Sequence, residues 1–405
     1  MDTRLSRPLS GIRVLDLSQV LAGPYCGMLL AGLGAEVIKV EGPEGDLSRS
    51  MGPPYLVDSG TLYLYANRNK KSLVLDLKRV EGQNALHRLV RHADVLIHNA
   101  LPRSARKLRI DYPTLSSINP RLIYATVSAF GQTGPRSESP GFDAVFQAVG
   151  GLMSLTGPAR GKGSKAAASV VDVGTGILTA LGILACLLQR RQTGHAARVG
   201  GALLDTVLAL QGNLFTYSSV IGDDPRRVGN GSYFMISNCF ATADGQLMIS
   251  LPTTRFWHRF CKALGQASLQ SDSRFSDHQS RISNKPALER VLARIFRTKT
   301  TAQWLKILQP VVPCGPLLSY KQVIQDQQVR HNGLFKMDVY KGIPYRVVRS
   351  PVRLDGKLMD GRLAAPSLGQ HTGQILRAAR FTRAEILELD RLGVTIPNPS
   401  PKRPH

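Results

Sequence analysis

Hydrophobic and polar positions in the first third of the chain alternate in a way that predicts strands and helices in turn. Apolar runs at residues 12–17, 36–40, 72–77, 94–98 and 122–128 predict strands, and helical spacing at 24–33 and about 81–92 predicts helices. Pro24 suits the first turn of a helix. Such alternation predicts a doubly wound α/β domain with a parallel sheet and right-handed crossovers. Ligands of such sheets bind beyond the carboxyl ends of the strands, so we expect the loops 18–23, 99–102 and 128–135 to line a site.

The pattern changes in the middle of the chain. A helix is expected at 177–191, ending in basic residues before Gly194, and another at about 203–221. Beyond the polar segment 223–231, short strands at 239–242 and 246–251 and helices near 255–264 and 287–296 predict a smaller α+β domain. With a final helix at 383–392, the predicted division is 1–222 and 322–405 for the large domain and 223–321 for the small one.

Composition is ordinary for an enzyme of 405 residues with 43% hydrophobic residues. The first residues lack the apolar core of a signal peptide, and the apolar run 176–188 is too short to span a bilayer, so we expect a cytoplasmic protein without membrane attachment. The five cysteines form no Cys-x-x-Cys pair and the nine histidines have no ligand spacing. Neither a disulfide framework nor a metal site is therefore expected.

The charge is less ordinary, because 52 Lys and Arg against 28 Asp and Glu give +24. Such a charge attracts nucleic acid, an anionic membrane, or a phosphorylated and carboxylated small ligand. The basic residues occur in short separate clusters without interleaved aromatic residues or a DNA-reading motif. A dedicated nucleic-acid partner is therefore disfavoured.

Several enzyme classes lack their motifs in this chain. Glu41 stands where a dinucleotide-binding fold carries its ribose acid, but residues 22–27 lack Gly-x-Gly-x-x-Gly and Pro24 removes an N–H donor. No Walker lysine motif and no Gly-x-Ser-x-Gly segment occurs. Nicotinamide oxidoreductase, kinase and hydrolase activities are therefore disfavoured.

Asp172 follows the β-branched pair Val170 and Val171 and precedes glycines and a long apolar segment. The pattern predicts a strand-to-helix junction, where unpaired N–H groups and the positive end of the helix dipole would keep the carboxylate ionised. Nearby glycines would let a ligand approach closely. Aspartate at such a place is often only an N-cap, so the pattern alone leaves both a capping and a nucleophilic role open.

Strings distributed over nearly the whole chain resemble the class III CoA-transferases. They include LDLSQVLAGP at 15–24, LGAEVIKVE at 33–41, NRNKKS at 67–72, FGQTGP at 130–135, GFDAV at 141–145, GLMSLTG at 151–157 and VPCGP at 312–316. The family contains formyl-CoA, carnitine and dicarboxylate CoA-transferases and α-methylacyl-CoA racemase. The resemblance implies a Rossmann-like domain made from both chain ends, a smaller middle domain, and two subunits interlocked as a homodimer.

The resemblance also implies a covalent role for Asp172, which would attack the donor thioester and then carry CoA itself. CoA and acyl-CoA would then be substrates, with no permanently bound cofactor. In the family a glycine-rich loop covers the nucleophile, and Gly229, Asn230 and Gly231 match it. A flexible turn between domains would have the same composition. Many members continue this loop with His-Pro, whereas this chain has Ser232 and Tyr233.

For CoA binding, the resemblance points to Gln19, Val20, Ala22, Leu75, Lys78, Asn99, Lys107 and Leu108. Members commonly carry arginine where this chain has Gly42, so a phosphate or adenine contact is either missing or supplied by Arg49 or Arg68. The racemases pair their aspartate with a histidine at the position of Phe142, which disfavours racemisation here. The adjacent Asp143 matches a carboxylate that lies near the nucleophile in transferases, although a packing or capping role stays open.

Three strings, at 63–72, 328–334 and 368–372, most resemble the glutarate type of succinyl-CoA:dicarboxylate CoA-transferase. A distal carboxylate on the acceptor would favour an arginine fork, for which Arg49 and Arg103 are candidates. The sequence therefore predicts succinyl-CoA as donor and a dicarboxylic acid as acceptor. Alternatives that stay open are a formyl-CoA or carnitine type of transferase, an acyl-CoA racemase, and a non-catalytic CoA-binding or nucleic-acid-associated paralogue.

Overall fold

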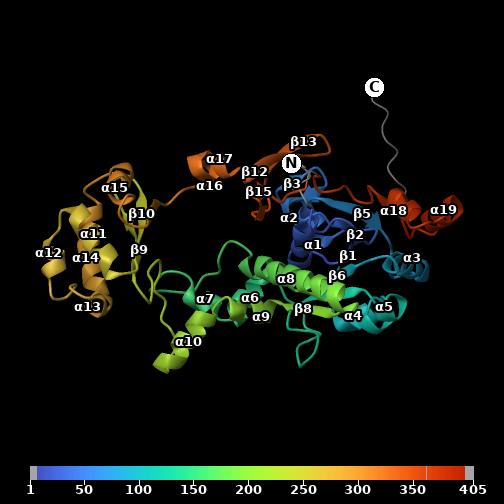
Figure 1. Cartoon of the computed structure of the whole chain (residues 1–405), viewed down its shortest axis with the longest axis horizontal. Helices are drawn as coiled ribbons and strands as arrows, with labels where there is room; N and C mark the ends of the chain where they lie inside the picture. Colours follow the sequence, from blue (N-terminus) through green and yellow to red (C-terminus); the bar gives the residue numbers. More distant parts are fainter. Residues whose placement is uncertain (1–6, 362, 397–405) are drawn as a thin grey trace. The chain divides into compact units, whose positions relative to one another are not determined.

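The computed structural model describes residues 7–361 and 363–396. Contacts divide the chain into two compact units (Figure 1). The first unit comprises residues 1–150, 166–213 and 333–405, and the second comprises 151–165 and 214–332. The division into functional domains at residues 222 and 322, made from the sequence, stays a prediction.

A six-stranded sheet forms the centre of the first unit. Its order is β5-β2-β1-β6-β7-β8, and every pairing in it is parallel. The strands are β1 (Arg13–Asp16), β2 (Glu36–Glu41), β5 (Lys70–Val74), β6 (Val95–His98), β7 (Ile123–Ser128) and β8 (Arg198–Ala202). This is the strand order of Rossmann folds. The strands succeed one another toward one edge of the sheet up to β5 and toward the other edge from β6 on, so the order reverses between β1 and β6. The predicted α/β class with a parallel sheet is confirmed.

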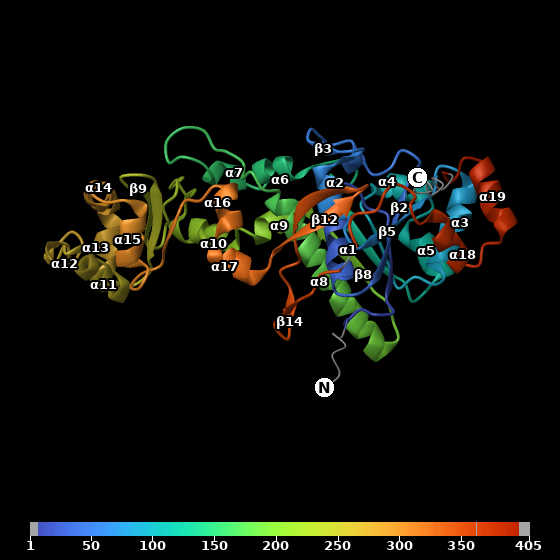
Figure 2. The same ribbon diagram turned by 90° about the horizontal axis from the view of Figure 1, so that it is seen from above.

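Helices cover both faces of this sheet (Figure 2). On one face α1 (Ala22–Gly32) packs along α8 (Val170–Thr193). The other face shares a core with α3 (Val80–Val90), α5 (Tyr112–Ile118), α18 (Thr372–Ala378) and α19 (Arg383–Arg391). Leu15 and Leu96 of the strands are fully buried in that core with Leu376 of α18. The segment after residue 333 therefore returns to the first unit.

Shorter elements complete the first unit. They are a 3-10 turn at Leu47–Arg49, β3 (Tyr55–Leu56), β4 (Ser59–Gly60), α2 (Thr61–Ala66), α4 (Pro102–Lys107), α6 (Asp143–Val149), α9 (Leu203–Ala209), and the hairpins of β12 (Phe335–Tyr340) with β13 (Ile343–Val348) and β14 (Arg353–Leu354) with β15 (Lys357–Leu358). Helix α10 (Gly212–Ile221) crosses the boundary between the units.

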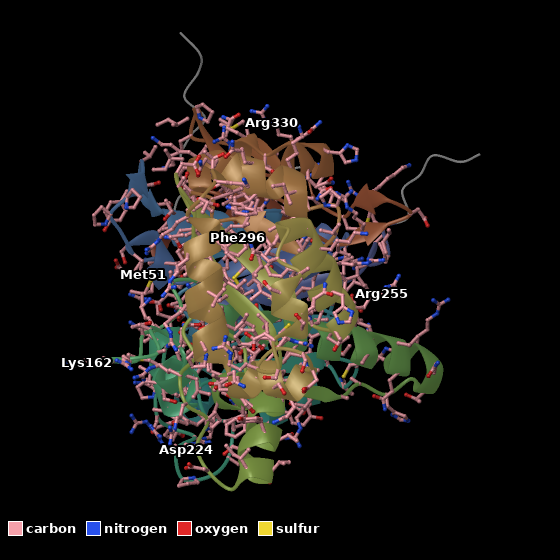
Figure 3. The ribbon with its side chains drawn as sticks, turned by 90° about the vertical axis from the view of Figure 1, so that its left-hand side faces the viewer. Met51, Lys162, Asp224, Arg255, Phe296 and Arg330 are labelled. Atoms are coloured by element: carbon pink, nitrogen blue, oxygen red, sulfur yellow. The ribbon has the colours of Figure 1, made fainter. Side chains whose placement is uncertain are left out.

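The second unit contains an antiparallel sheet in the order β11-β10-β9. Its elements are β9 (Ile236–Ala241), β10 (Gln246–Leu251), β11 (Cys314–Pro316), α7 (Leu152–Leu155), α11 (Thr254–Leu264), α12 (Ser268–Ser271), α13 (His278–Ser283), α14 (Lys285–Phe296), α15 (Thr301–Leu308), α16 (Tyr320–Gln325) and α17 (Gln327–Asn332). Trp257 and Phe296 are fully buried in its core. The exposed basic side chains Lys162, Arg255 and Arg330 come from three separate segments of the unit (Figure 3).

Two sequence-based expectations for the region after 170 were wrong, and one strand was missed. Val170 and Val171 form the first turn of α8 and not a strand, so this helix has 24 residues. Helix α8 is long and apolar enough to cross a membrane. Part of the helix is buried against α1 and the sheet, so its length and composition are only weak evidence for a membrane span. The helix expected at 203–221 is broken between α9 and α10, and β8 was not predicted.

Candidate active site

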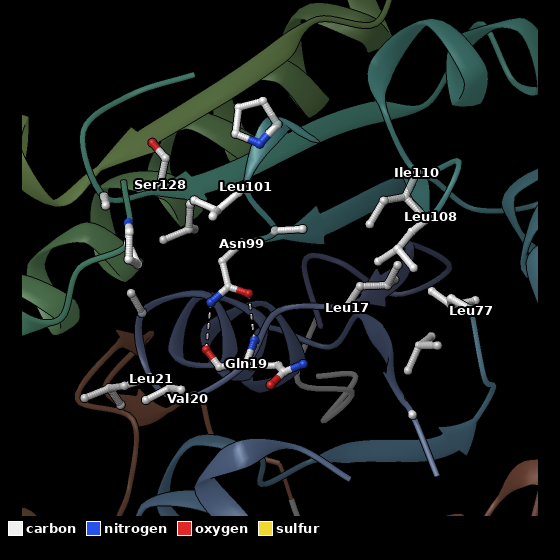
Figure 4. A pocket seen from close by; sticks show the side chains of 18 of the residues that line it. Leu17, Gln19, Val20, Leu21, Leu77, Asn99, Leu101, Leu108, Ile110 and Ser128 are labelled. Carbon is white, nitrogen blue, oxygen red and sulfur yellow. Dashed lines mark hydrogen bonds between the residues drawn. The ribbon is translucent and has the colours of Figure 1, made fainter. Parts of the chain in front are cut away.

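A pocket of about 450 Å³ lies in the first unit at the carboxyl ends of the strands (Figure 4). The loops after β1, β6 and β7 line it, as the strand-end rule predicts. Leu17, Leu108 and Ile110 line the pocket with apolar side chains, whereas Gln19 and Ser128 contribute polar groups. An apolar pocket with a few polar groups is the usual form of a small-ligand site.

The Asn99 side chain joins the two loops that meet where the strand order reverses. Its Oδ1 accepts a hydrogen bond from the Gln19 N–H at 3.0 Å, and its Nδ2 donates to the Gln19 carbonyl at 2.9 Å (Figure 4). The backbone N–H and the backbone carbonyl of Gln19 are therefore both held by the side-chain amide of Asn99. This arrangement fixes the loop after β1 relative to the end of β6.

The structure brings most of the expected CoA-binding residues together. Those that line the pocket are Gln19, Val20, Ala22, Leu75, Lys78, Asn99 and Leu108, together with Phe142 and Asp172. Lys107 ends α4 beside Leu108 but is not among the lining residues. Residue-by-residue reasoning missed Ser128 and Gln132, although both lie in the loop 128–135 that the strand-end rule indicated. Ile110 gave no sequence signal.

Asp172 is the third residue of α8 and is 8% exposed. Burial, and to a smaller extent the charge of Asp143, raise the pKa of Asp172 to about 7. None of the residues that the structure describes donates a hydrogen bond to its carboxylate. The effect expected of the helix end, which would favour the ionised form of Asp172, is therefore outweighed by burial and by the charge of Asp143.

Asp143 explains the difference. Its Oδ1 accepts hydrogen bonds from the N–H groups of Val171 at 2.8 Å and Asp172 at 3.1 Å, and its Oδ2 accepts one from Gln147 at 2.5 Å. Asp143 therefore caps α8, whereas Ser169 at the N-cap position makes no side-chain cap bond. The amide groups expected to stabilise a charge on Asp172 are already occupied.

Phe142 lines the pocket and is 51% exposed. It precedes Asp143 at the start of α6 and carries no group able to move a proton. Gly42 also lines the pocket, and a Cβ built there would meet no atom within 4 Å. The wall of the pocket is therefore open at the position where the family resemblance led us to expect arginine.

Arg49 does not join this site. Its Nε and Nη2 donate to both oxygens of Glu41 at 2.7 and 2.9 Å, and Nη2 also donates to the Tyr63 hydroxyl at 2.6 Å. Arg68 is equally engaged, because its Nη2 donates to the Val348 carbonyl at 2.6 Å and its side chain is buried. Neither guanidinium is placed to bind a substrate carboxylate or to replace an arginine at Gly42.

The glycine-rich loop belongs to the second unit. Gly229 has φ of +61°. Lys285 donates to the Ser232 carbonyl at 2.8 Å, and the Tyr233 hydroxyl donates to the Arg226 carbonyl at 2.7 Å. Tyr233, which departs from the His-Pro of many relatives, therefore closes the base of the loop.

Metal ligands are not clustered in the described part of the chain. Within residues 7–361 and 363–396, no group of three or more His, Cys, Asp or Glu side chains could hold a metal ion. All five cysteines are free thiols.

Comparison with known proteins gives consistent matches along the chain. A family model described as CoA-transferase family III matches residues 9–372. The succinate–glutarate CoA-transferase of Agrobacterium fabrum is 36% identical over 91% of this chain and 95% of its own length. The succinyl-CoA:mesaconate CoA-transferase of Haloarcula hispanica is 34% identical over 92% and 96%.

A solved structure supports the same assignment. The crystal structure of a CAIB/BAIF family protein from Brucella suis has a TM-score of 0.80 and 32% identity, covering 92% of this chain and 99% of its own. The range 9–372 that the family model matches includes the strands that carry the pocket and the helix that carries Asp172. The chain therefore belongs to CoA-transferase family III and is an enzyme of the CoA-transferase class.

Proposed function

We propose that the enzyme moves CoA from succinyl-CoA to a dicarboxylic acid, with Asp172 as the covalent carrier. The observation that carries this proposal is the position of Asp172, a buried carboxylate with no hydrogen-bond donor among the described residues, on the wall of the strand-end pocket. The choice of acids follows the relatives that are named for glutarate and mesaconate.

The reaction proceeds in two matched halves. The Asp172 carboxylate attacks the thioester carbonyl, which forms an aspartyl–succinyl anhydride and releases the CoA thiolate. The thiolate attacks the Asp172 carbonyl of the anhydride, which gives an aspartyl-CoA thioester and free succinate. The acceptor carboxylate then attacks this thioester, and the released thiolate attacks the acceptor's carbonyl in the new anhydride. The products are the acceptor's CoA thioester and the original carboxylate, with no net proton change.

The environment of Asp172 suits these steps. Anhydrides and thioesters hydrolyse in water, and a residue that is only 8% exposed is shielded from it. Because Asp143 occupies the end of α8, the oxygens of Asp172 are free of strong hydrogen bonds that would lower their nucleophilicity. With a pKa of about 7, a large share of the carboxyl is ionised at neutral pH.

The pocket suits CoA. Leu75 and Leu108 give it apolar walls, and Lys78 adds a point charge of the kind that binds phosphate. We place the pantetheine arm along the loops held by Asn99, with its thioester toward Asp172. No permanently bound cofactor takes part in this chemistry.

The glycine-rich loop and a second subunit complete the proposed site. Gly229, Asn230 and Gly231 would cover Asp172 and direct N–H groups at the developing oxyanion. An interlocked homodimer is supported by the exposed apolar face of α8, which carries Ile177, Leu178, Leu181 and Leu188. The large domain, 1–222 with 322–405, would bind CoA and the small domain, 223–321, would carry the loop, in a cytoplasmic enzyme.

Racemisation receives no support from this site. A racemase needs a second group that returns the α-proton on the other side of the substrate, and the position beside Asp143 is occupied by Phe142.

A substrate panel tests the proposal. Purified enzyme is incubated with succinyl-CoA and, separately, with glutarate, mesaconate, other C4 to C6 dicarboxylates, formate, carnitine and an aromatic acid, and new thioesters are detected by mass. The proposal predicts dicarboxyl-CoA products that are lost in Asp172→Asn. Conversion of formate, carnitine or the aromatic acid alone would overturn the choice of acceptor.

A further inference from the structure

The backbone at Val20 adopts an unusual conformation inside the pocket loop. Its φ is +72°, in the left-handed region that β-branched residues avoid. Val20 lines the pocket beside Gln19 and Leu21. A strained residue persists only where its surroundings hold it in place, and such residues gather at functional sites.

A buried ion pair holds this loop on both sides of Gln19. Asp46 Oδ1 accepts a hydrogen bond from the Val20 N–H at 3.1 Å, and its Oδ2 lies 2.6 Å from the Lys39 ammonium. Lys39 also donates to the carbonyl of Ser18. The side chains of Lys39 and Asp46 are both completely buried. The pair therefore contacts the loop backbone before and after the residue that Asn99 holds.

A second buried pair holds the far end of the same loop. The Lys70 ammonium lies 2.7 Å from Asp16 Oδ2 and donates to the Pro24 carbonyl at 2.8 Å and to Asn67 Oδ1 at 2.8 Å. Asp16 in turn accepts the N–H of Ser18 at 3.1 Å. Buried ion pairs add little net stability, because desolvation offsets their attraction. Two of them on one short loop therefore indicate a role in fixing its shape.

We propose that Asp46, held by Lys39, is a positioning residue of the pocket. It keeps the backbone of Val20 in the left-handed conformation, so that residues 19–22 have their ligand-binding shape already in the free enzyme. Asp46 acts through the Val20 N–H and does not line the pocket. Preorganisation of this kind lowers the ordering cost of binding. The inference deepens the proposed function, because it takes this pocket as the CoA site.

The test is a double-mutant cycle on CoA affinity, measured by calorimetry in the full-length protein. Asp46→Asn keeps an acceptor oxygen but loses the ion pair with Lys39 that holds this oxygen at the Val20 N–H, so it is expected to weaken CoA binding about tenfold, which corresponds to about 1.4 kcal/mol. At saturating acyl-CoA the turnover number should change little, because Asp46 is not at the reacting atoms. In a Val20→Gly background the same substitution should cost only about twofold, since glycine adopts a positive φ without strain.

Val57 provides the matched control, because it also has a positive φ, of +59°, but is 55% exposed and lies outside the pocket. Val57→Gly should leave the tenfold effect of Asp46→Asn unchanged. If Asp46→Asn does not fold, because it leaves the Lys39 ammonium buried without its carboxylate partner, Lys39→Met with Asp46→Leu removes both charges and enters the same cycle.

Two results would overturn the inference: undiminished CoA affinity in the Asp46 variant, or an equal loss with valine and with glycine at position 20. A wild-type enzyme that binds no CoA would instead refute the proposed function. In that case amide hydrogen exchange of residues 18–22 tests the inference, which predicts faster exchange in Asp46→Asn and is contradicted by unchanged exchange.

Discussion

Replacement of Asp172 by asparagine should abolish transfer and stabilise the fold in a pH-dependent way. The folded-state pKa of about 7, against an ordinary value of 3.8, means that the folded protein binds this proton more tightly than the unfolded chain does. Stability from that proton is fully present below pH 3.8 and is lost as pH rises to about 7. At about 1.4 kcal/mol per pKa unit, wild type should be roughly 4 kcal/mol less stable than Asp172→Asn above pH 7.

Thermal and denaturant unfolding of both proteins at pH 5 and pH 8 measures this difference. The asparagine variant should melt higher at pH 8, and the gap should shrink at pH 5. Asp205→Asn, which changes an exposed aspartate in the first turn of α9, is the matched control and should change the melting temperature little at either pH. An Asp172→Asn gap that is absent at pH 8, or equal at both pH values, would refute the reasoning about burial.

Three further substitutions test neighbouring claims. Asp143→Asn keeps an acceptor for the end of α8 but removes a charge, so the pH midpoint of kcat/KM for acyl-CoA, set by the Asp172 pKa, should move to lower pH; an unmoved midpoint would contradict this. Arg49→Met leaves Glu41 buried without its partner and should cost about 3–5 kcal/mol of stability in unfolding experiments, whereas a higher acceptor KM at unchanged stability would make Arg49 a substrate ligand. Gly42→Arg places a guanidinium on the open pocket wall and should tighten CoA binding in a salt-dependent way by calorimetry; equal affinity would count against a phosphate nearby.

The sequence predicted the parallel sheet because its buried strands are unbroken apolar runs. Val95, Leu96 and Ile97 of β6 are fully buried, and such a run has a clear signal. Strand β8 has glycines at 200 and 201, and of its five residues only the last, Ala202, is buried, so its identity depends on pairing with β7 and not on its own composition. Tertiary contact also decides the start of α8, where the β-branched pair is helical because Asp143 caps it.

The candidate site was predicted as far as strand ends determine it. Loops after parallel strands must meet at one edge, which places Gln19, Asn99 and Ser128 around one pocket whatever their chemistry. The partners of charged side chains could not be predicted from the sequence, because they depend on which groups the fold buries next to each other. Arg49 was expected to face a ligand, but it pairs with Glu41. The pKa of Asp172 could not be predicted for the same reason.

Intact-mass measurement of the enzyme after mixing with succinyl-CoA tests the central claim most directly. The account predicts a covalent adduct of CoA or succinyl mass on wild type, which hydroxylamine converts to a hydroxamate at Asp172, and no adduct on Asp172→Asn. Absence of any adduct on wild type while CoA transfer proceeds, or an adduct that persists in Asp172→Asn, would contradict it.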